Sequence, residues 1–389
     1  MRRTIVLTGN TMASYPQGGG HWSVFLQYLL GLQLLGHDFL WLELLKSRGS
    51  RSRDERLIRL FIARFNHIGL GDNCAMGLYD RSCGTPSFDD LEIHNFDKVR
   101  LRRIIGNADV LWNFHCAMRQ PLLGLFSRRA LLDLDPGHLQ VSALHWDMEI
   151  LEHDVVLTVG TNIKGVDCET PTLEQEWHPF LPPMFLPFWS TTYEPHPNAP
   201  FTSITQWNWG EAEEMWLGDR SLSVGKRDAY MRYLKLPLLT EIPLELAANI
   251  DTEDRTGDLD LLRANGWSLV RPHQVARTPA LYRTYISKSR GEFGCAKPIY
   301  AELRTGWFSD RSAAYLAMHR PVVIEDTGMP SWIQDSPGIL TFRTLDEARD
   351  RLLECVANYG EHVAGAAAFA KEHLDSSKVL TRLINISLP

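Results

Sequence analysis

The sequence predicts an α/β protein of two domains with a cleft between them. Three observations support this prediction. The chain opens with a strand, a glycine-rich turn, a helix and a second strand, which is the order of a βαβ unit in a parallel sheet. A proline-crowded stretch at residues 169–200 interrupts this alternation, which then resumes. The length of 389 residues is enough for between two and three domains of about 150 residues each.

The first domain is predicted over residues 1–195. Apolar residues recur at helical spacing between His21 and Leu35 and predict the first helix. The strands of this domain are predicted at 4–8, 39–42, 109–114, 130–134 and 155–159. Each strand ends in polar or glycine residues, where α/β sheets place their functional loops. The stretch Lys46–Arg56 is rich in Arg and Ser and is predicted to be a mobile loop, with a phosphorylated or acidic acceptor as a secondary hypothesis.

The connection between the domains is predicted at residues 169–200, whose eight prolines argue against any regular structure. The second domain is predicted over residues 200–371. Its strands are expected at 201–205, 267–270, 293–296, 321–324 and 339–342, and its helices at 259–265 and 309–318. The chain is predicted to end in helices at 345–359, 362–373 and 377–386.

The composition excludes several classes of protein. Forty Lys and Arg residues against 47 Asp and Glu residues give a net charge of −7, so the basic footprint of a dedicated nucleic-acid binder is absent. The six cysteines form no C-x-x-C pair, which argues against a zinc site and a disulfide-dense secreted scaffold. The N-terminal apolar run is too short for a signal peptide, and no run of about 18 apolar residues occurs. We therefore expect a cytoplasmic protein with no metal, no nucleic-acid partner and no membrane-spanning segment.

The most informative stretch for chemistry surrounds a glycine turn at Gly306. The turn opens a helix that begins with Ser309 and Asp310, and the free N–H groups and dipole of such a helix start suit a diphosphate. The next strand ends in Glu325 and Asp326, which could bind sugar hydroxyls at its carboxyl end. An N-capped helix followed by a buried strand and a polar turn would show the same spacing, so that interpretation stays open here.

The block Phe293–Pro330 resembles the nucleotide-sugar half of GT-B glycosyltransferases, most specifically at Gly306–Ser309 and His319–Val323. The Gly18–His21 opening and the terminal helices are also similar to these enzymes. The resemblance implies two Rossmann-like domains facing each other across a cleft, with a nucleoside-diphosphate sugar in the second domain and an acceptor in the first. It also implies that a last helix, at about 372–389, crosses back to pack on the first domain.

The resemblance has departures. Ser312 stands where plant-type inverting members carry a Glu, and the two Glu residues that retaining members often present eight positions apart are missing from Gly306–Ala314. The ribose contact and the choice between retention and inversion therefore stay open. The residues expected to bind the donor are Gly19, Gly20, Lys297, Gly306, Trp307, Ser309, Asp310, Arg311, Glu325, Asp326, Thr327 and Gly328.

A second candidate element is the glycine-rich turn that ends in His21. Its glycines allow the backbone to approach a ligand closely, and His21 at the helix N-terminus is expected to face the cleft. A neutral imidazole there can act as a general base or bind an oxygen of the donor. A flexible turn with an exposed histidine is the alternative interpretation.

Two strand exits and two basic residues complete the candidate site. Asp135 could accept the proton of an acceptor hydroxyl, although Asp-Pro-Gly is also common turn chemistry. Trp112 could form the floor of an acceptor pocket beside His115, but alternation makes the tryptophan equally plausible as core. Lys297 and Arg311 could neutralise a leaving diphosphate.

The predicted function is transfer of a sugar from a nucleoside-diphosphate sugar to an acceptor, which is a small molecule or a glycan. The nucleotide sugar is a co-substrate, and no cofactor is expected. Two alternatives remain: a sugar-nucleotide epimerase on the same architecture, and a protein that binds nucleotide sugars or carbohydrates without catalysis.

Overall fold

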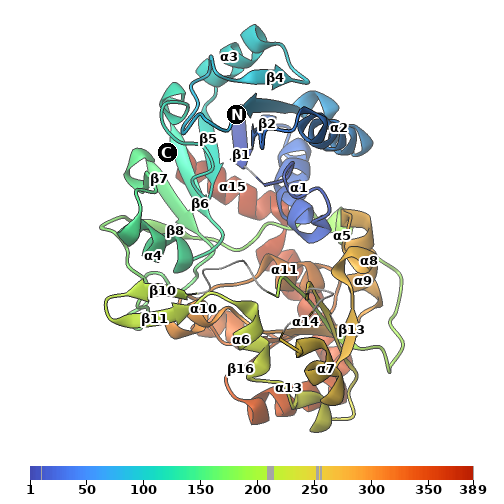
Figure 1. Ribbon diagram of the computed structural model, residues 1–389. Helices are drawn as coiled ribbons and strands as arrows, with labels where there is room; N and C mark the ends of the chain where they lie inside the picture. The colour runs from blue at the N-terminus through green and yellow to red at the C-terminus, as the bar shows by residue number, and fades with distance from the viewer. Residues whose placement is uncertain (10, 208–213, 251–253, 255, 389) are drawn as a thin grey trace.

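The structure is a computed structural model that describes residues 1–9, 11–207, 214–250, 254 and 256–388. These residues form two α/β domains, one above the other in Figure 1, and each domain is built around its own sheet. The prediction of two α/β domains is therefore confirmed. Among the described helices, none has both the length and the apolar character needed to span a membrane.

The first sheet has eight strands in the spatial order β4-β3-β2-β1-β5-β6-β7-β8, and only its β3–β4 pair is antiparallel. Its strands are β1 (Thr4–Gly9), β2 (Asp38–Lys46), β3 (Cys74–Tyr79), β4 (Glu92–His94), β5 (Val110–Phe114), β6 (Arg129–Asp133), β7 (Val155–Thr158) and β8 (Trp177–Pro179). Strand β1 pairs with β2 on one side and β5 on the other. Successive strands are therefore added in one direction from β1 to β4 and in the opposite direction from β5 to β8, which makes a topological switch point at β1.

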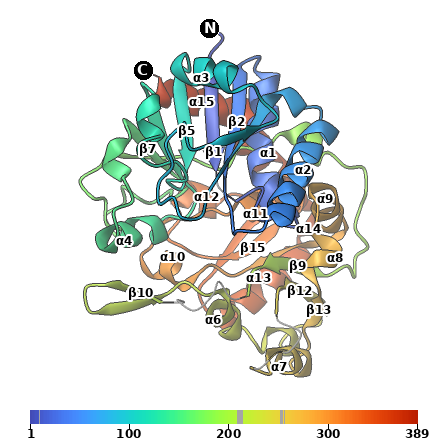
Figure 2. The same ribbon diagram turned by 45° about the horizontal axis from the view of Figure 1, so that its top comes forward.

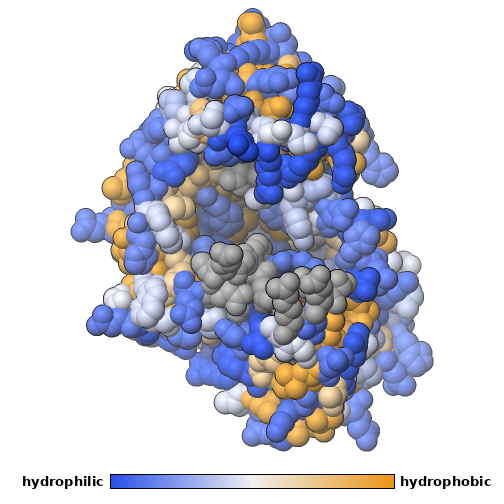
Figure 3. Space-filling model, viewed as in Figure 1, coloured by the Kyte–Doolittle hydropathy of each residue, from blue (hydrophilic) through white to orange (hydrophobic). Residues whose placement is uncertain are grey.

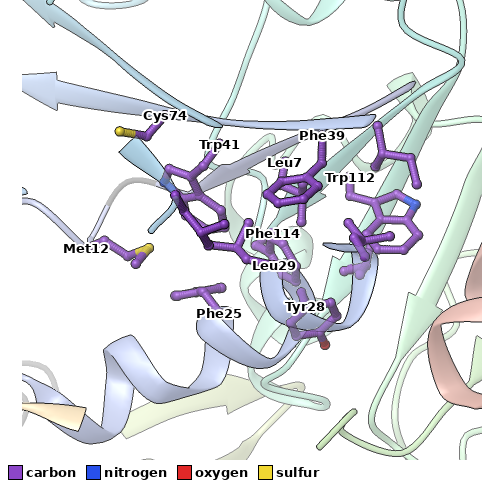
Figure 4. Close-up of a cluster of buried hydrophobic side chains, with 14 of the residues drawn as sticks. Leu7, Met12, Phe25, Tyr28, Leu29, Phe39, Trp41, Cys74, Trp112 and Phe114 are labelled. Carbon is purple, nitrogen blue, oxygen red and sulfur yellow. The ribbon is translucent and has the colours of Figure 1, made fainter. Parts of the chain in front are cut away.

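Helices cover both faces of this sheet. They are α1 (Gly19–Leu34), α2 (Arg51–His67), α3 (Lys98–Gly106) and α4 (His138–His145). Because successive strand residues point to opposite faces, Ile5 and Leu7 pack under α1 and α2, whereas Val6 packs on the side of α3. Figure 4 shows the first of these cores, in which Phe25 of α1 meets the rings of Trp41 and Phe114.

The second sheet has six parallel strands in the order β13-β12-β9-β14-β15-β16. They are β9 (Phe201–Thr205), β12 (Leu244–Ala248), β13 (Ser268–Val270), β14 (Gly291–Gly294), β15 (Val322–Glu325) and β16 (Ile339–Phe342), and a separate hairpin is formed by β10 (Glu214–Leu217) and β11 (Arg220–Ser223). This order repeats that of the first domain, so the switch point lies between β9 and β14. Both sheets are therefore Rossmann-like.

The helices of the second half are mostly short. They are α5 (Leu186–Trp189), α6 (Lys226–Met231), α7 (Asp258–Ala264), α8 (Pro272–Val275), α9 (Pro279–Lys288), α10 (Pro298–Glu302), α11 (Asp310–Ala317), α12 (Ser331–Gln334), α13 (Leu345–Ala357), α14 (Tyr359–Phe369) and α15 (Ser376–Ser387). Residues 370–374 form a π-helical turn between α14 and α15.

The chain crosses between the domains twice, and its last helix lies on the first domain. Helix α15, red in Figure 1, lies among the blue and teal elements of that domain, where Leu380 and Leu383 join the core under α1. A Cβ on Gly31 of α1 would lie 2.4 Å from Leu380 Cδ1, so the glycine permits the close approach of the two helices.

Two predictions of irregular structure are wrong. The proline-rich segment 169–200 contains β8 and α5, since an edge strand pairs on one side only and tolerates proline at its end. The arginine-rich stretch predicted as a loop enters α2 at Arg51. Further along α2, Leu57, Ile58 and Phe61 are buried at helical spacing, and this apolar face packs the helix onto the sheet.

Candidate active site

The carboxyl ends of both central sheets meet at one cleft. Figure 3 shows the hollow between the upper and lower domains, and Figure 2 shows the ribbons of the two domains turned by 45°. The loops after β1, β5 and β6 approach it from the first domain, and the loop after β14 approaches it from the second. Each domain thus presents its switch point to the other, and switch points are where open α/β sheets bind ligands.

His21 lies in the first turn of α1, after the loop that follows β1. Its Nε2 is 2.6 Å from Thr11 Oγ1, and its ring packs edge-on against Tyr15 and Phe25. Burial, with a smaller contribution from His115, lowers the pKa of His21 to about 4. The imidazole is therefore neutral near pH 7, as a proton acceptor must be.

His115 follows β5 in a left-handed backbone conformation, with φ of 52°, and Cys116 continues it with φ of 54°. Such angles are uncommon outside glycine and mark positions that the fold imposes. The residue is exposed. The surrounding protein lowers its pKa to about 4, although the charge of Asp135 acts in the opposite direction. The charge of His115 also contributes to the lowered pKa of His21, so the two imidazoles interact electrostatically.

Asp135 and Lys297 join the two domains. Lys297 Nζ, at the start of α10, lies 3.0 Å from both carboxylate oxygens of Asp135, which follows β6. Figure 1 shows α4 above α10 at this junction. Burial would raise the pKa of Asp135, but Lys297 and the neighbouring His138 and His115 lower it below its ordinary value. Asp135 is therefore a weak base in this arrangement.

Asp133 stabilises the turn after β6 that contains Asp135. One oxygen of this fully buried carboxyl accepts from Asp135 N at 2.9 Å, and the other accepts from Gln140 and Thr158 at 2.9 and 2.8 Å. Desolvation raises its pKa to about 6 despite these bonds. The turn is thus fixed by three hydrogen bonds.

Lys226 is a candidate that the sequence did not reveal. It begins α6, and its buried Nζ donates to Cys295 O at 2.6 Å while lying 5.0 Å from the centre of the Trp307 ring. Burial and the positive charges of Arg311 and Lys297 lower its pKa to about 7. The lysine follows a hairpin that stands outside the main sheet, so no strand-exit rule pointed to it.

Arg311 is bound within the second domain. Its Nε lies 2.5 Å from Glu292 Oε1, and its Nη1 donates to Ile204 O at 2.9 Å. Glu292 is fully buried, so this pair is shielded from water. The predicted contact between Arg311 and the diphosphate would have to compete with it.

The glycines predicted to approach phosphate have other close neighbours. A Cβ on Gly306, whose φ is 69°, would lie 2.3 Å from Asn162 N of the first domain. The Gly306 carbonyl accepts from Thr161 N and Oγ1 at 3.0 and 2.6 Å. At α1, Gly19 N donates to Ala276 O at 2.7 Å, and a Cβ on Gly20 would lie 3.4 Å from the ring of Tyr282. All three glycines thus permit the domains to approach each other.

Ser309 and Asp310 begin α11 as the spacing predicted. Ser309 Oγ accepts from Arg311 N at 3.1 Å and caps the helix. Asp310 lies beside α1, where a narrow cavity is lined by Tyr28, Asp310 and Ala314. Burial raises the pKa of Asp310. The start of α11 thus lies against the first domain.

The two carboxylates after β15 already have partners. Glu325 accepts from Arg232 at 2.9 Å and from Ala296 N at 3.0 Å, and 3% of its side chain is exposed. Asp326 accepts from Arg343 at 2.6 Å and from Gly328 N at 2.8 Å. Sugar hydroxyls would have to share these carboxylates with the protein donors, and the prediction that both bind the sugar stays a prediction.

Thr327 and Gly328 support the Gly306 turn. Thr327 Oγ1 donates to Trp307 O at 2.8 Å, and the Thr327 carbonyl accepts from Gly306 N at 2.7 Å. A Cβ on Gly328 would lie 2.9 Å from Arg304 Cβ. The turns at 304–307 and 325–328 therefore form one packed unit.

Trp112 is not part of a pocket. Its side chain is completely buried in the core of Figure 4, and its Nε1 donates to Ser387 Oγ of α15 at 3.1 Å. The prediction that Trp112 forms an acceptor-pocket floor is wrong because this side of β5 faces α15.

Within the residues that the structure describes, no group of three or more His, Cys, Asp or Glu side chains is arranged to hold a metal ion.

Comparison with known proteins shows likeness in structure alone. No protein-family model matches the chain, and no curated protein matches it by sequence. An alpha-glucosyltransferase solved with UDP-glucose and DNA containing an abasic site superposes with a TM-score of 0.60 at 12% identity over 100% of both chains. HepE from Anabaena, solved with UDP and glucose, gives 0.57 at 10% identity over 99% of both chains. A glycosyltransferase from Rickettsia africae ESF-5 gives 0.55 at 10% identity over 99% and 98%.

These matches confirm the fold expected from the Gly306–Val323 block, which is the GT-B arrangement of two Rossmann-like domains. The alpha-glucosyltransferase was solved with DNA as well as with UDP or UDP-glucose. The sequence-based expectation of no nucleic-acid partner for the present chain therefore stays a prediction.

Proposed function

We propose that the protein is a glycosyltransferase that moves a sugar from a nucleoside-diphosphate sugar to an acceptor hydroxyl or amine. The observation that carries the proposal is the cleft where both switch points meet, with neutral imidazoles on one wall and cations on the other. Transfer needs a group that accepts a proton from the acceptor and positive charge that stabilises the leaving diphosphate. The two walls offer these two chemistries.

The donor would lie against the second domain. Lys226 and Lys297 supply positive charge beside the aromatic face of Trp307, and the α11 start at Ser309 adds the N-terminal end of a helix dipole. Both lysines are buried or nearly so, and low solvent access strengthens their interaction with phosphate. Arg311, which is ion-paired with Glu292, adds to the positive charge near Lys226.

The acceptor would lie against the first domain, and His21 is the preferred general base. Its imidazole is neutral, lies on the cleft side of α1, and is oriented by Thr11. Asp135 is the second candidate, but an ion-paired carboxylate accepts a proton less readily than a free one. In our proposal Asp135 pairs with Lys297 across the cleft and gives it up to the diphosphate when the donor binds. His115, which interacts electrostatically with His21, would contact the acceptor from the loop after β5.

A binding and turnover experiment tests the proposal. A panel of nucleoside diphosphates should raise the melting temperature, because a ligand that binds only the native state stabilises it. The matching nucleotide sugar should then be hydrolysed slowly or transferred to acceptors. Epimerisation of the sugar without transfer would favour the epimerase alternative, and binding without turnover across an acceptor panel would favour the non-catalytic one. No stabilisation by any nucleoside diphosphate would contradict the proposal.

We also propose that the enzyme works in the cytoplasm. All six cysteines are free, and four of them are buried. Unpaired cysteines are typical of proteins in reducing compartments.

A further inference from the structure

A second concave site lies on the first domain, where β2 and β3 end side by side. It is an open pocket of about 510 Å³. Four cationic side chains line it, from the end of β2, the start of α2 and the loop after β3: Lys46, Arg48, Arg53 and Arg81. The cleft site described above uses none of these residues.

Three of the four cations of this pocket lack a carboxylate partner among the described residues, and the fourth, Arg53, has only a distant one. Lys46, Arg48 and Arg81 have no carboxylate within 4.0 Å in the parts of the chain that the structure describes. Arg53 Nη1 is buried, 3.7 Å from Asp54 Oδ1, and donates no hydrogen bond to any described residue. Like charges at short range repel one another. A chain with a net charge of −7 that gathers four cations in one pocket, three of them without a carboxylate partner in the described chain, has a site suited to an anion.

The first turn of α2 carries two arginines and one buried acid, Asp54. Arg51 and Arg53 stand in its first turn, where the positive end of the helix dipole favours acidic residues. Ser50, the N-cap residue, makes no side-chain hydrogen bond that caps the helix. Arg51 is paired with Glu55, whereas Arg53 turns into the pocket. The two arginines therefore add positive charge to the positive end of the helix dipole, and Arg53 directs it into the pocket.

The pocket is connected to the proposed base by one short loop. Ser14 lines the pocket, and the ring of the next residue, Tyr15, lies 6.3 Å from the ring of His21. The loop is held to β2 by Glu43, whose Oε1 accepts from Ala13 N at 2.8 Å. A ligand that fills the pocket thus lies on the same side of the first domain as His21.

We propose that this pocket binds a phosphate group of the acceptor, so that the acceptor is a phosphorylated small molecule whose reacting group reaches His21. This inference rests on the proposed glycosyl transfer and specifies its substrate class. The four cations line one pocket of limited volume, and the overall charge is negative. Both facts favour a compact phosphate over a polyanion such as DNA.

The test uses inorganic phosphate and the full chain. Binding is measured by calorimetry with the donor site saturated by the nucleoside diphosphate that stabilises the wild type. Arg48→Ala and Arg81→Ala should each weaken phosphate binding by about tenfold, the loss of one charge-assisted contact. Arg59→Ala is the matched control, because this arginine lies on α2 but pairs with Glu55 outside the pocket. Unchanged phosphate affinity in the two pocket variants would overturn the inference.

Further arms identify the source of the phosphate and separate the two proposals. Vesicles containing phosphatidic acid that bind the wild type, but neither pocket variant, would support the pocket and place the phosphate on a lipid. The inference would be overturned if Arg48→Ala and Arg81→Ala weakened the binding of a DNA duplex but left the binding of inorganic phosphate unchanged. That result would assign the pocket to nucleic acid. Nucleoside-diphosphate affinity should be equal in the wild type and both variants. If the wild type bound no nucleoside diphosphate, the proposed function would be contradicted, whatever the pocket binds.

Discussion

Lys297 of the second domain and Asp135 of the first form an ion pair across the cleft, with Nζ 3.0 Å from each carboxylate oxygen. The two residues were predicted for opposite tasks, cation for the donor and base for the acceptor. Their pairing makes the tasks interdependent, because the lysine that would meet the diphosphate is the same group that lowers the pKa of the carboxylate. A bound diphosphate would compete with Asp135 for Lys297.

The first prediction follows from this competition. Lys297→Met should weaken nucleoside-diphosphate binding by roughly 10-fold or more, since a hydrogen bond to a charged group contributes about 1.5–3 kcal/mol. Asp135→Asn should leave that affinity equal or raise it, because the lysine is released from its carboxylate. Calorimetric titration of both variants is the measurement. Weaker nucleotide binding in Asp135→Asn would show that the lysine depends on Asp135 for its position.

The second prediction concerns His21 as general base. His21→Ala should fold and bind the donor but lose roughly 10²-fold or more in turnover, which is the usual contribution of a general base. Because the pKa of His21 is about 4, the base stays deprotonated at neutral pH. The profile of kcat/KM should therefore be flat for this group down to about pH 5 and fall through pH 4.

Asp135→Asn is the matched control for the His21 variant. If only the asparagine variant abolishes transfer, the base is the carboxylate and His21 is structural. A loss of donor affinity without loss of turnover in His21→Ala would make the imidazole a donor ligand.

The third prediction uses the lowered pKa of Lys226. At a pKa of about 7 its ammonium is partly deprotonated near neutral pH, and a bound diphosphate favours the charged form. Nucleotide affinity should therefore fall as the pH rises through 7, and binding at pH 7 to 8 should take up protons. Calorimetry in buffers of different ionisation enthalpy measures that uptake. Lys226→Arg keeps the charge at every accessible pH and should remove the dependence, whereas an unchanged pH profile in this variant would exclude Lys226 as its source.

Much of the candidate site could be predicted because its residues follow strands. His21, His115, Asp135 and Lys297 each come after a strand of a parallel sheet, and the strand order brings those strand ends to one cleft. Lys226 follows a hairpin outside the sheets, and no periodicity in the sequence connects it to the cleft. Its position depends on how the hairpin packs.

Other features were not predicted because they depend on tertiary contacts, which cannot be read from a single sequence. Strand β12 has the sequence Leu-Glu-Leu-Ala-Ala, which consists of helix-forming residues, but it lies between two parallel strands that impose the extended form. Glu325 was correctly placed at a strand exit. Its side chain turns to Arg232, a partner 93 positions earlier in the chain. Position along a strand is local information, whereas the choice of ion-pair partner is not.

The last prediction decides between two explanations of Gly306. The sequence predicted a phosphate-binding turn, in which Gly306→Val weakens nucleotide affinity and leaves the fold intact. The structure shows a left-handed glycine whose Cβ position lies 2.3 Å from Asn162 N, so a side chain there would strain the backbone and push the domains apart. The substitution should therefore destabilise the protein by about 2 kcal/mol or more, from the left-handed conformation and the overpacking together. Thermal unfolding without ligand measures this effect. Gly360→Ala is the control, because a Cβ at that position meets nothing within 4 Å. A Gly306→Val variant with wild-type Tm and weakened nucleotide binding would instead support the phosphate-binding explanation. It would show that the contact between the domains accommodates the valine side chain, whereas the bound nucleotide does not.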